Sequence, residues 1–179
     1  NNSISFVNTN TLREGDFRDA NASGLYFDLT NKAKTWNYWG NLEGSWVMNG
    51  KTKFGVEGTA AAAKISGNHR YQASFFFRTK DYNIDDLGYT GQTNYINYYG
   101  YYGYRYLQPK GAFNTLFLNF NLNYNRRLDP DLYNNFTFNF NSEFQTKKFF
   151  TFGGGFEFTP FGTNDIYEPR VHGRHVKVP

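Results

Sequence analysis

The chain has 179 residues, and aromatic residues make up 21% of them while all hydrophobic residues together reach only 39%. An average soluble domain is roughly 45–50% apolar, so an ordinary aliphatic core is not expected. The formal charge of +4 does not require a nucleic-acid partner, and a sequence without cysteine excludes disulfides, thiolate metal sites and thiol nucleophiles.

Length and hydropathy separate two kinds of membrane protein. The sequence has no uninterrupted apolar run of about 18 residues, which excludes a transmembrane helix. A membrane β-barrel is not excluded, because its strands need only about 9–11 residues and alternate in character. The mean hydropathy of −0.70 is compatible with such alternation. The sequence starts Asn1-Asn2-Ser3 without an initiator Met or a signal peptide, so we expect a processed or partial product.

Apolar residues recur with a period of two along most of the chain, which indicates strands with two different faces. Between 116 and 125, Leu, Phe and Tyr occupy every second position, and four of the five intervening residues are Asn. The same alternation predicts, in chain order, strands at residues 3–10, 23–31, 36–48, 53–63, 70–79, 94–107, 115–125, 134–145 and 149–159. Residues 160–179 are predicted to be loop and tail.

Turn residues separate these strands as an antiparallel meander requires. Short connections are predicted at 31–35, 66–68, 109–114 and 146–148. Longer ones are predicted at 11–21, 80–94, 126–133 and from 160 onward. All the longer connections fall at one end of the sheet. The turn at 49–51 is the one short connection predicted at that end. Short turns at one end and long loops at the other are typical of outer-membrane barrels.

The predicted fold is all-β: an antiparallel up-and-down transmembrane β-barrel, formed as a partial barrel of eight or nine strands within one domain over residues 1–179. In lipid every strand N–H and C=O must be paired. We therefore expect the remaining strands of the same barrel, or partner outer-membrane subunits, beside this chain. A closed eight-stranded barrel, a soluble β-sandwich and a fibrous β-protein are the competing interpretations.

The alternation assigns side chains to two environments. The lumen-facing polar candidates are Asp28, Glu43, Lys53, Glu57, Arg78, Arg105, Glu143 and Glu157. The lipid-facing aromatic candidates are Trp36, Tyr38, Trp46, Tyr98, Tyr102, Tyr104, Phe120, Phe136, Phe138, Phe140, Phe152 and Phe156. Outer-membrane lipid is thus the first expected partner, with the aromatic rings forming girdles at the two interfaces.

A resemblance to a known family rests on residues 8–29 (NTNTLREGDFRDANASGLYFDL), 66–89 (SGNHRYQASFFFRTKDYNIDDLGY) and 161–170 (FGTNDIYEPR). These stretches resemble a Bacteroidota outer-membrane β-barrel family of unknown function, in which a carbohydrate-binding-module-like domain precedes a long C-terminal barrel. The resemblance implies that this chain is part of that barrel and lies in the outer membrane. It supplies no catalytic residues.

Side chains with catalytic or metal-binding chemistry form no convincing site. His172 and His175 have a two-ligand spacing but sit among basic residues, and the acidic loop residues lack the spacing of an EF-hand. Gly153-Gly154-Gly155 lies in a strand and marks a bend or a close backbone approach. Aromatic and charged residues fall on opposite faces, which argues against nucleic-acid binding. We expect no catalytic residue, no metal and no cofactor.

The sequence thus predicts a non-enzymatic outer-membrane β-barrel protein that acts as a channel, scaffold or anchor. Asn-rich surfaces dotted with aromatic rings also suit sugars, so glycan is a candidate partner. The alternatives are a membrane anchor for a surface-binding or enzyme-associated module, and a component of a larger secretion or uptake complex. A soluble β-sandwich that binds a partner ranks last.

Overall fold

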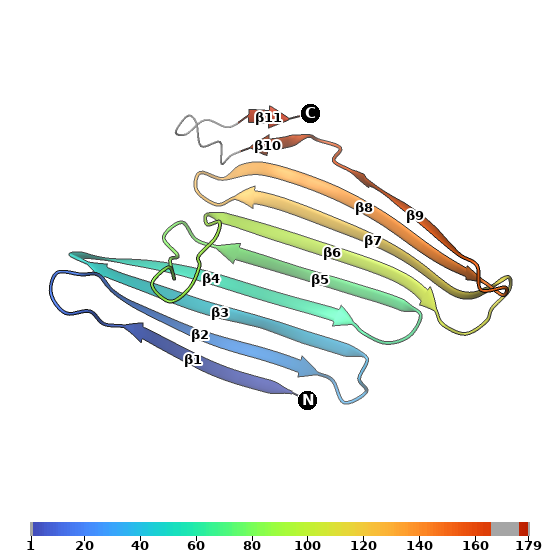
Figure 1. Cartoon of the computed structure of the whole chain (residues 1–179), viewed down its shortest axis with the longest axis horizontal. Coiled ribbons are helices and arrows are strands. Elements are labelled where there is room, and N and C mark those ends of the chain that lie inside the picture. The colour runs from blue at the N-terminus through green and yellow to red at the C-terminus, as the bar shows by residue number, and fades with distance from the viewer. Residues whose placement is uncertain (1, 166–175, 179) are drawn as a thin grey trace.

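The computed structural model describes residues 2–165 and 176–178. Nine strands form one antiparallel sheet in which every strand pairs with its neighbour in sequence (Figure 1). The strands of this sheet are β1 (Ser3–Thr11), β2 (Asp19–Thr30), β3 (Trp36–Asn49), β4 (Lys51–Lys64), β5 (His69–Arg78), β6 (Tyr95–Tyr106), β7 (Phe113–Arg127), β8 (Leu132–Thr146) and β9 (Thr151–Phe158). Within the described ranges no helix is long and apolar enough to cross a membrane.

Residues 160–179 correct one prediction, because two short strands lie where only loop and tail were expected. β10 (Thr163–Asp165) pairs antiparallel with β11 (Val176–Val178) and lies beside β8 (Figure 1). A strand of three residues is too short to show an alternating pattern. A second difference is the start of β2 at Asp19, four residues before the predicted start. Polar side chains at Asn21 and Ser23 interrupt the apolar alternation there.

The strand register fixes the two faces of the sheet. Glu43 pairs with Glu57, Glu57 with Arg78, and Arg78 with Tyr95. Because successive side chains in a strand point to opposite faces, these residues and every second residue from them share one side. We call this side the polar face and the opposite side, which carries Leu42, the apolar face.

The sheet is a single open layer. Among the described residues, the nine strands contact only their neighbours in the sheet, except that β8 also contacts β10. β1 and β9 therefore remain the two edges, and the sheet is not closed. In the described part of the chain the buried hydrophobic residues are few: Ala20, Ala61, Ala63 and Tyr82.

Large hydrophobic side chains cover the apolar face and remain exposed. Leu42 is 57% exposed and Phe156 is 56% exposed. Neighbouring rings contact each other across strands, as in the pair Phe120 and Phe140, whose ring centroids lie 4.8 Å apart. Such cross-strand aromatic pairs stabilise a sheet, but nothing in the described part of the chain covers this face.

Candidate functional site

The register places all eight predicted polar residues on the polar face, and all twelve predicted aromatic residues on the apolar face. That these faces meet a lumen and a lipid phase stays a prediction. The eight polar residues do not form one site. Glu43, Glu57 and Arg78 come together on three adjacent strands, whereas Arg105 and Glu143 lie farther along the sheet on β6 and β8.

Arg78 and Glu57 form a largely buried ion pair. The Arg78 Nε–H donates to Glu57 Oε2 at 2.6 Å, and the two side chains are only 16% and 12% exposed. Glu43, the cross-strand neighbour of Glu57, accepts hydrogen bonds from Asn41 Nδ2 at 2.6 Å and from the Tyr82 hydroxyl at 3.0 Å. Both carboxylates are therefore committed to structural partners, and the pair does not offer a free acid and base for catalysis.

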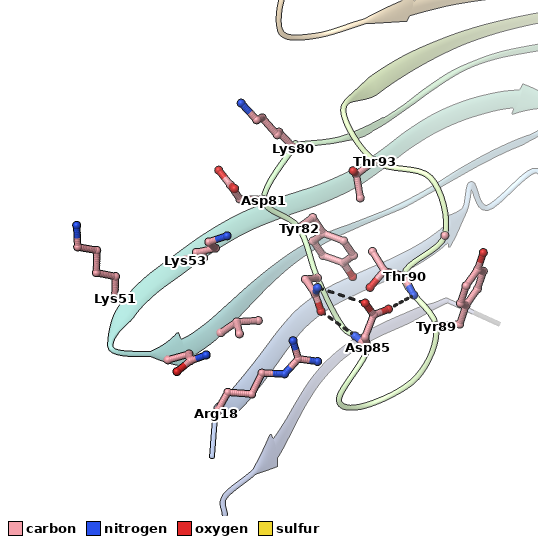
Figure 2. A pocket seen from close by; sticks show the side chains of 14 residues that line it. Arg18, Lys51, Lys53, Lys80, Asp81, Tyr82, Asp85, Tyr89, Thr90 and Thr93 are labelled. Atoms are coloured by element: carbon pink, nitrogen blue, oxygen red, sulfur yellow. Dashed lines mark hydrogen bonds between the residues drawn. The ribbon is translucent and has the colours of Figure 1, made fainter. Parts of the chain in front are cut away.

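Sequence analysis did not identify the residue at the centre of this cluster, Tyr82. It belongs to the β5–β6 loop, residues 79–94, which folds onto the polar face over β3 and β4 (Figures 1 and 2). Its side chain is 2% exposed. Burial, and then the negative charge of Glu43, raises the pKa of Tyr82, so the phenol stays protonated and donates to Glu43.

The approach of the loop to the sheet depends on two small residues. The backbone N–H of Asn83 donates to the hydroxyl of Ser45, which is fully buried, at 2.9 Å. A Cβ atom at Gly55 would lie 2.0 Å from the backbone N of Tyr82, so only glycine fits beneath the loop. A glycine within a strand pattern is the signal in the sequence for such close backbone approach.

Internal hydrogen bonds shape the loop. The Thr90 N–H donates to Asp85 Oδ1 at 3.0 Å and the Ile84 N–H donates to the Thr90 hydroxyl at 2.8 Å. Hydrogen bonds from Thr90 lower the pKa of Asp85. Arg78, beyond its ion pair, donates to the carbonyl oxygens of Thr90 and Gln92, so it links the sheet to the far side of the loop.

Asp86 fastens the loop to the β1–β2 connection. Arg13 Nη1 lies 2.8 Å from Asp86 Oδ1, and Arg18 Nε lies 2.8 Å from Asp86 Oδ2. The Asp86 side chain is only 6% exposed, and a carboxylate is rarely buried so deeply without such pairing. Residues far apart in sequence therefore hold this loop over β1 to β4.

A pocket of about 500 Å³ opens beside the loop. Polar and basic side chains from β4, from the loop and from the β1–β2 connection line it (Figure 2). The basic residues are Arg18, Lys51, Lys53 and Lys80, and the acidic ones are Asp81 and Asp85. Lys53 is the one predicted lumen residue among them.

A second feature of the polar face is a ladder of side-chain amides across β6, β7 and β8. The Tyr99 hydroxyl donates to Asn121 Oδ1 at 2.7 Å, and Asn121 Nδ2 donates to Asn139 Oδ1 at 3.1 Å. Two parallel rows repeat the arrangement: Asn97, Asn125 and Asn135 form one, and Tyr101, Asn119 and Asn141 form the other. The asparagines that lower the hydropathy of the chain thus bond to one another on this face.

A family model described as "Domain of unknown function (DUF5916)" matches residues 1–179. The chain belongs to the DUF5916 family. Neither the curated proteins nor the solved structures contain a match to it.

The histidines of this DUF5916 chain do not gather into a site where they are described. His69 Nδ1 lies 3.0 Å from the Tyr102 hydroxyl on the apolar face, while His172 and His175 lie outside the described residues. The described residues contain no group of three or more His, Asp or Glu side chains arranged to hold a metal ion. The β5–β6 loop with its pocket is therefore one candidate site of the DUF5916 sheet, and the amide ladder is the other.

Proposed function

We propose that this DUF5916 sheet is part of the wall of an outer-membrane β-barrel that acts without catalysis. In this proposal the apolar face contacts lipid and the polar face lines the lumen. The observation that carries it is a single-layer sheet with one face of exposed aromatic and aliphatic side chains opposite a face of hydrogen-bonded polar ones.

The free energy of hydration favours lipid as the environment of the apolar face. Removing one large apolar side chain from water gains about 1.5–3 kcal/mol. Among the described residues, nine rings on this face are exposed: Phe6, Tyr38, Phe54, Tyr71, Phe75, Tyr98, Phe152, Phe156 and Phe158. Together they involve a free energy at least comparable to the roughly 5–15 kcal/mol by which a folded domain is stable. The apolar face must therefore be shielded from water, and a lipid bilayer shields this face on all nine strands at once.

Strand length and the chemistry at the strand ends agree with a membrane span. β3 and β4 have 14 residues each, and β7 and β8 have 15, which exceeds the roughly 9–11 that a tilted membrane strand needs. Lys64 Nζ lies 5.5 Å from the centroid of the Tyr71 ring near the short-turn end. Aromatic rings with a neighbouring cation are typical of a membrane interface.

At the opposite end, the apolar face becomes polar on the first hairpin. Asn8 Nδ2 donates to the Ser23 hydroxyl at 2.7 Å, and Asn10 Nδ2 donates to Asn8 Oδ1 at 2.7 Å. Asn21 also donates to Asn10. These side chains sit next to the β1–β2 connection, so they mark where this hairpin leaves the proposed lipid phase toward the long loops.

The free edges of the sheet define the partners that the proposal needs. Unpaired backbone groups cost several kcal/mol each in lipid, so β1 and β9 require partner strands, either from the remainder of the same barrel or from another outer-membrane subunit. The resemblance to barrels that follow a carbohydrate-binding-module-like domain adds glycan handling at the cell surface to the proposal. An anchor for a surface-binding or enzyme-associated module, or a part of a secretion or uptake complex, would use the same wall.

Flotation with lipid vesicles tests the proposal. The full-length protein is expected to float with vesicles in a density gradient and to stay with them after a wash in alkaline carbonate, which removes peripheral proteins. A peripheral protein mixed with the same vesicles serves as the control and is released. A folded monomer that is stable in detergent-free buffer would overturn the membrane proposal.

A further inference from the structure

The β5–β6 loop is held to the polar face at three independent places. Tyr82 is buried against Gly55 and donates to Glu43. Arg78 joins Glu57 to the carbonyl groups of the loop, and Asp86 is clamped by two arginines from the β1–β2 connection. Such a loop does not swing freely, because opening it would expose a buried tyrosine and separate the buried Asp86 from Arg13 and Arg18.

The position of the loop determines what it can do. It leaves the sheet after β5, returns at β6, and extends over β4 and β3 toward β1, all at the end where the long connections lie (Figure 1). In a barrel whose lumen is the polar face, a loop that covers four strands on the inside narrows the passage at this end. Loops folded into the lumen are a known way of restricting a barrel channel.

Four of the six charged side chains that line the pocket are basic. Among the described residues that line the pocket, Arg18 is paired with Asp86, and Asp85 accepts hydrogen bonds from within the loop. Lys80 Nζ lies 3.8 Å from Asp129 Oδ2, so Lys51 and Lys53 are the pocket cations that have no ion pair among the described residues. Lys51 and Lys53 project from β4 on the same side, because they are two residues apart in one strand.

We infer that the β5–β6 loop is a fixed constriction of the lumen and that its lysine-lined pocket selects small anions, such as inorganic phosphate or carboxylates. This inference rests on the proposed membrane function. Rings of Lys and Arg select anions in pores, and a cleft with one dominant sign of charge raises the local concentration of the opposite ion by a factor of about 10 to 1,000. Because the loop narrows the passage, a permeating solute passes close to the lysines of β4.

The reversal potential of the full-length protein in a planar bilayer under a KCl gradient tests the inference. The wild-type protein is expected to pass chloride in preference to potassium. The double variant Lys51→Glu and Lys53→Glu is expected to lower the chloride-to-potassium permeability ratio on the order of tenfold. The matched control is Lys147→Glu and Lys148→Glu, which makes the same charge change in the exposed β8–β9 turn at the opposite end, and its ratio should equal that of the wild type.

Addition of inorganic phosphate gives a second readout on the same channels. Phosphate should reduce the chloride current of the wild type and of the control variant, and it should have a much weaker effect on the β4 double variant. A cation-selective wild type, or an unchanged ratio in the β4 double variant, overturns the inference. Protein that floats with vesicles but passes no ions also overturns the inference, and it leaves the proposed membrane barrel unaffected. Protein that fails to float overturns the proposed function itself.

Discussion

At the scale of single residues, Gly55 is the position where the fold has the least freedom. The backbone of Tyr82 occupies the space that any Cβ atom at Gly55 would need, with a separation of 2.0 Å. The glycine is therefore required by the loop above it, since a strand by itself favours residues with a side chain. Tyr82, Ser45 and Gly55 act together, because the hydroxyl and the missing side chain both allow the loop to approach.

Gly55→Ala is expected to displace the loop and to destabilise the protein by about 1–3 kcal/mol, the usual cost of overpacking. Displacement exposes Tyr82, so cleavage by chymotrypsin after this residue should become faster. Cleavage sites identified by mass spectrometry, together with unfolding by urea in detergent micelles, measure both effects.

Gly154→Ala is the matched control for this substitution, because a Cβ atom at Gly154 would meet nothing within 4 Å. It should leave both the cleavage at Tyr82 and the unfolding midpoint as in the wild type. Equal behaviour of the two alanine variants would show that the loop does not rest on β4.

A glycine in a strand signals a close backbone approach, but the sequence does not identify the β5–β6 loop as the segment that approaches Gly55. Tyr82 follows Asp81 in a polar connection, where an exposed tyrosine is the ordinary expectation. Its burial depends on contacts with Gly55, Ser45 and Glu43, which precede Tyr82 by 27 or more positions in the sequence. Such long-range contacts produce no periodic pattern in the sequence. The opposite signs of Glu57 and Arg78 were visible, but their pairing requires the β4–β5 register.

At the scale of elements, the amide ladder ties β6, β7 and β8 together on the polar face. Asn121 occupies the middle of one row, where it accepts from Tyr99 and donates to Asn139. Side-chain hydrogen bonds contribute about 0.5–1.5 kcal/mol each, and a polar group left without its partner costs about 1–3 kcal/mol. The ladder thus stabilises the register of three long strands.

Asn121→Leu is expected to lower the free energy of unfolding by about 1–3 kcal/mol, since the Tyr99 hydroxyl loses its acceptor and Asn139 keeps only the hydrogen bond from Asn141. Asn123→Leu, on the same face and the same strand, supplies the control, because the hydrogen bonds described above do not involve Asn123; a shift within about 0.5 kcal/mol is expected there. Urea titration in detergent micelles measures both. Equal losses in the two variants would contradict a role for the ladder.

Alternation in the sequence predicted the strands and their two faces, but it could not predict the ladder. Pairing across the β7–β8 hairpin shifts by one residue between Asn125 and Arg126, so counting outward from the turn gives the wrong partners. Tyr99 and Tyr101 were also missed as polar-face residues, because the run from Tyr98 to Tyr106 places tyrosines on both faces. A period-two pattern predicts neither the position of a bulge nor the faces of a strand whose aromatic residues occur on both sides.

At the scale of the whole molecule, the central claim is that one face of the sheet meets lipid and the other does not. The three tryptophans of the chain allow both faces to be probed, because Trp36 and Trp46 lie on the apolar face and Trp39 lies on the polar face. Variants that retain one tryptophan each, with the other two replaced by Phe, report each position separately after reconstitution into vesicles.

Fluorescence quenching by lipids brominated on their acyl chains is the decisive measurement. Brominated chains quench tryptophans that contact lipid, so Trp36 and Trp46 should be quenched strongly and Trp39 should keep its fluorescence. Equal quenching at all three positions, stronger quenching of Trp39, or no quenching of Trp46 would contradict a sheet that faces lipid with its aromatic side.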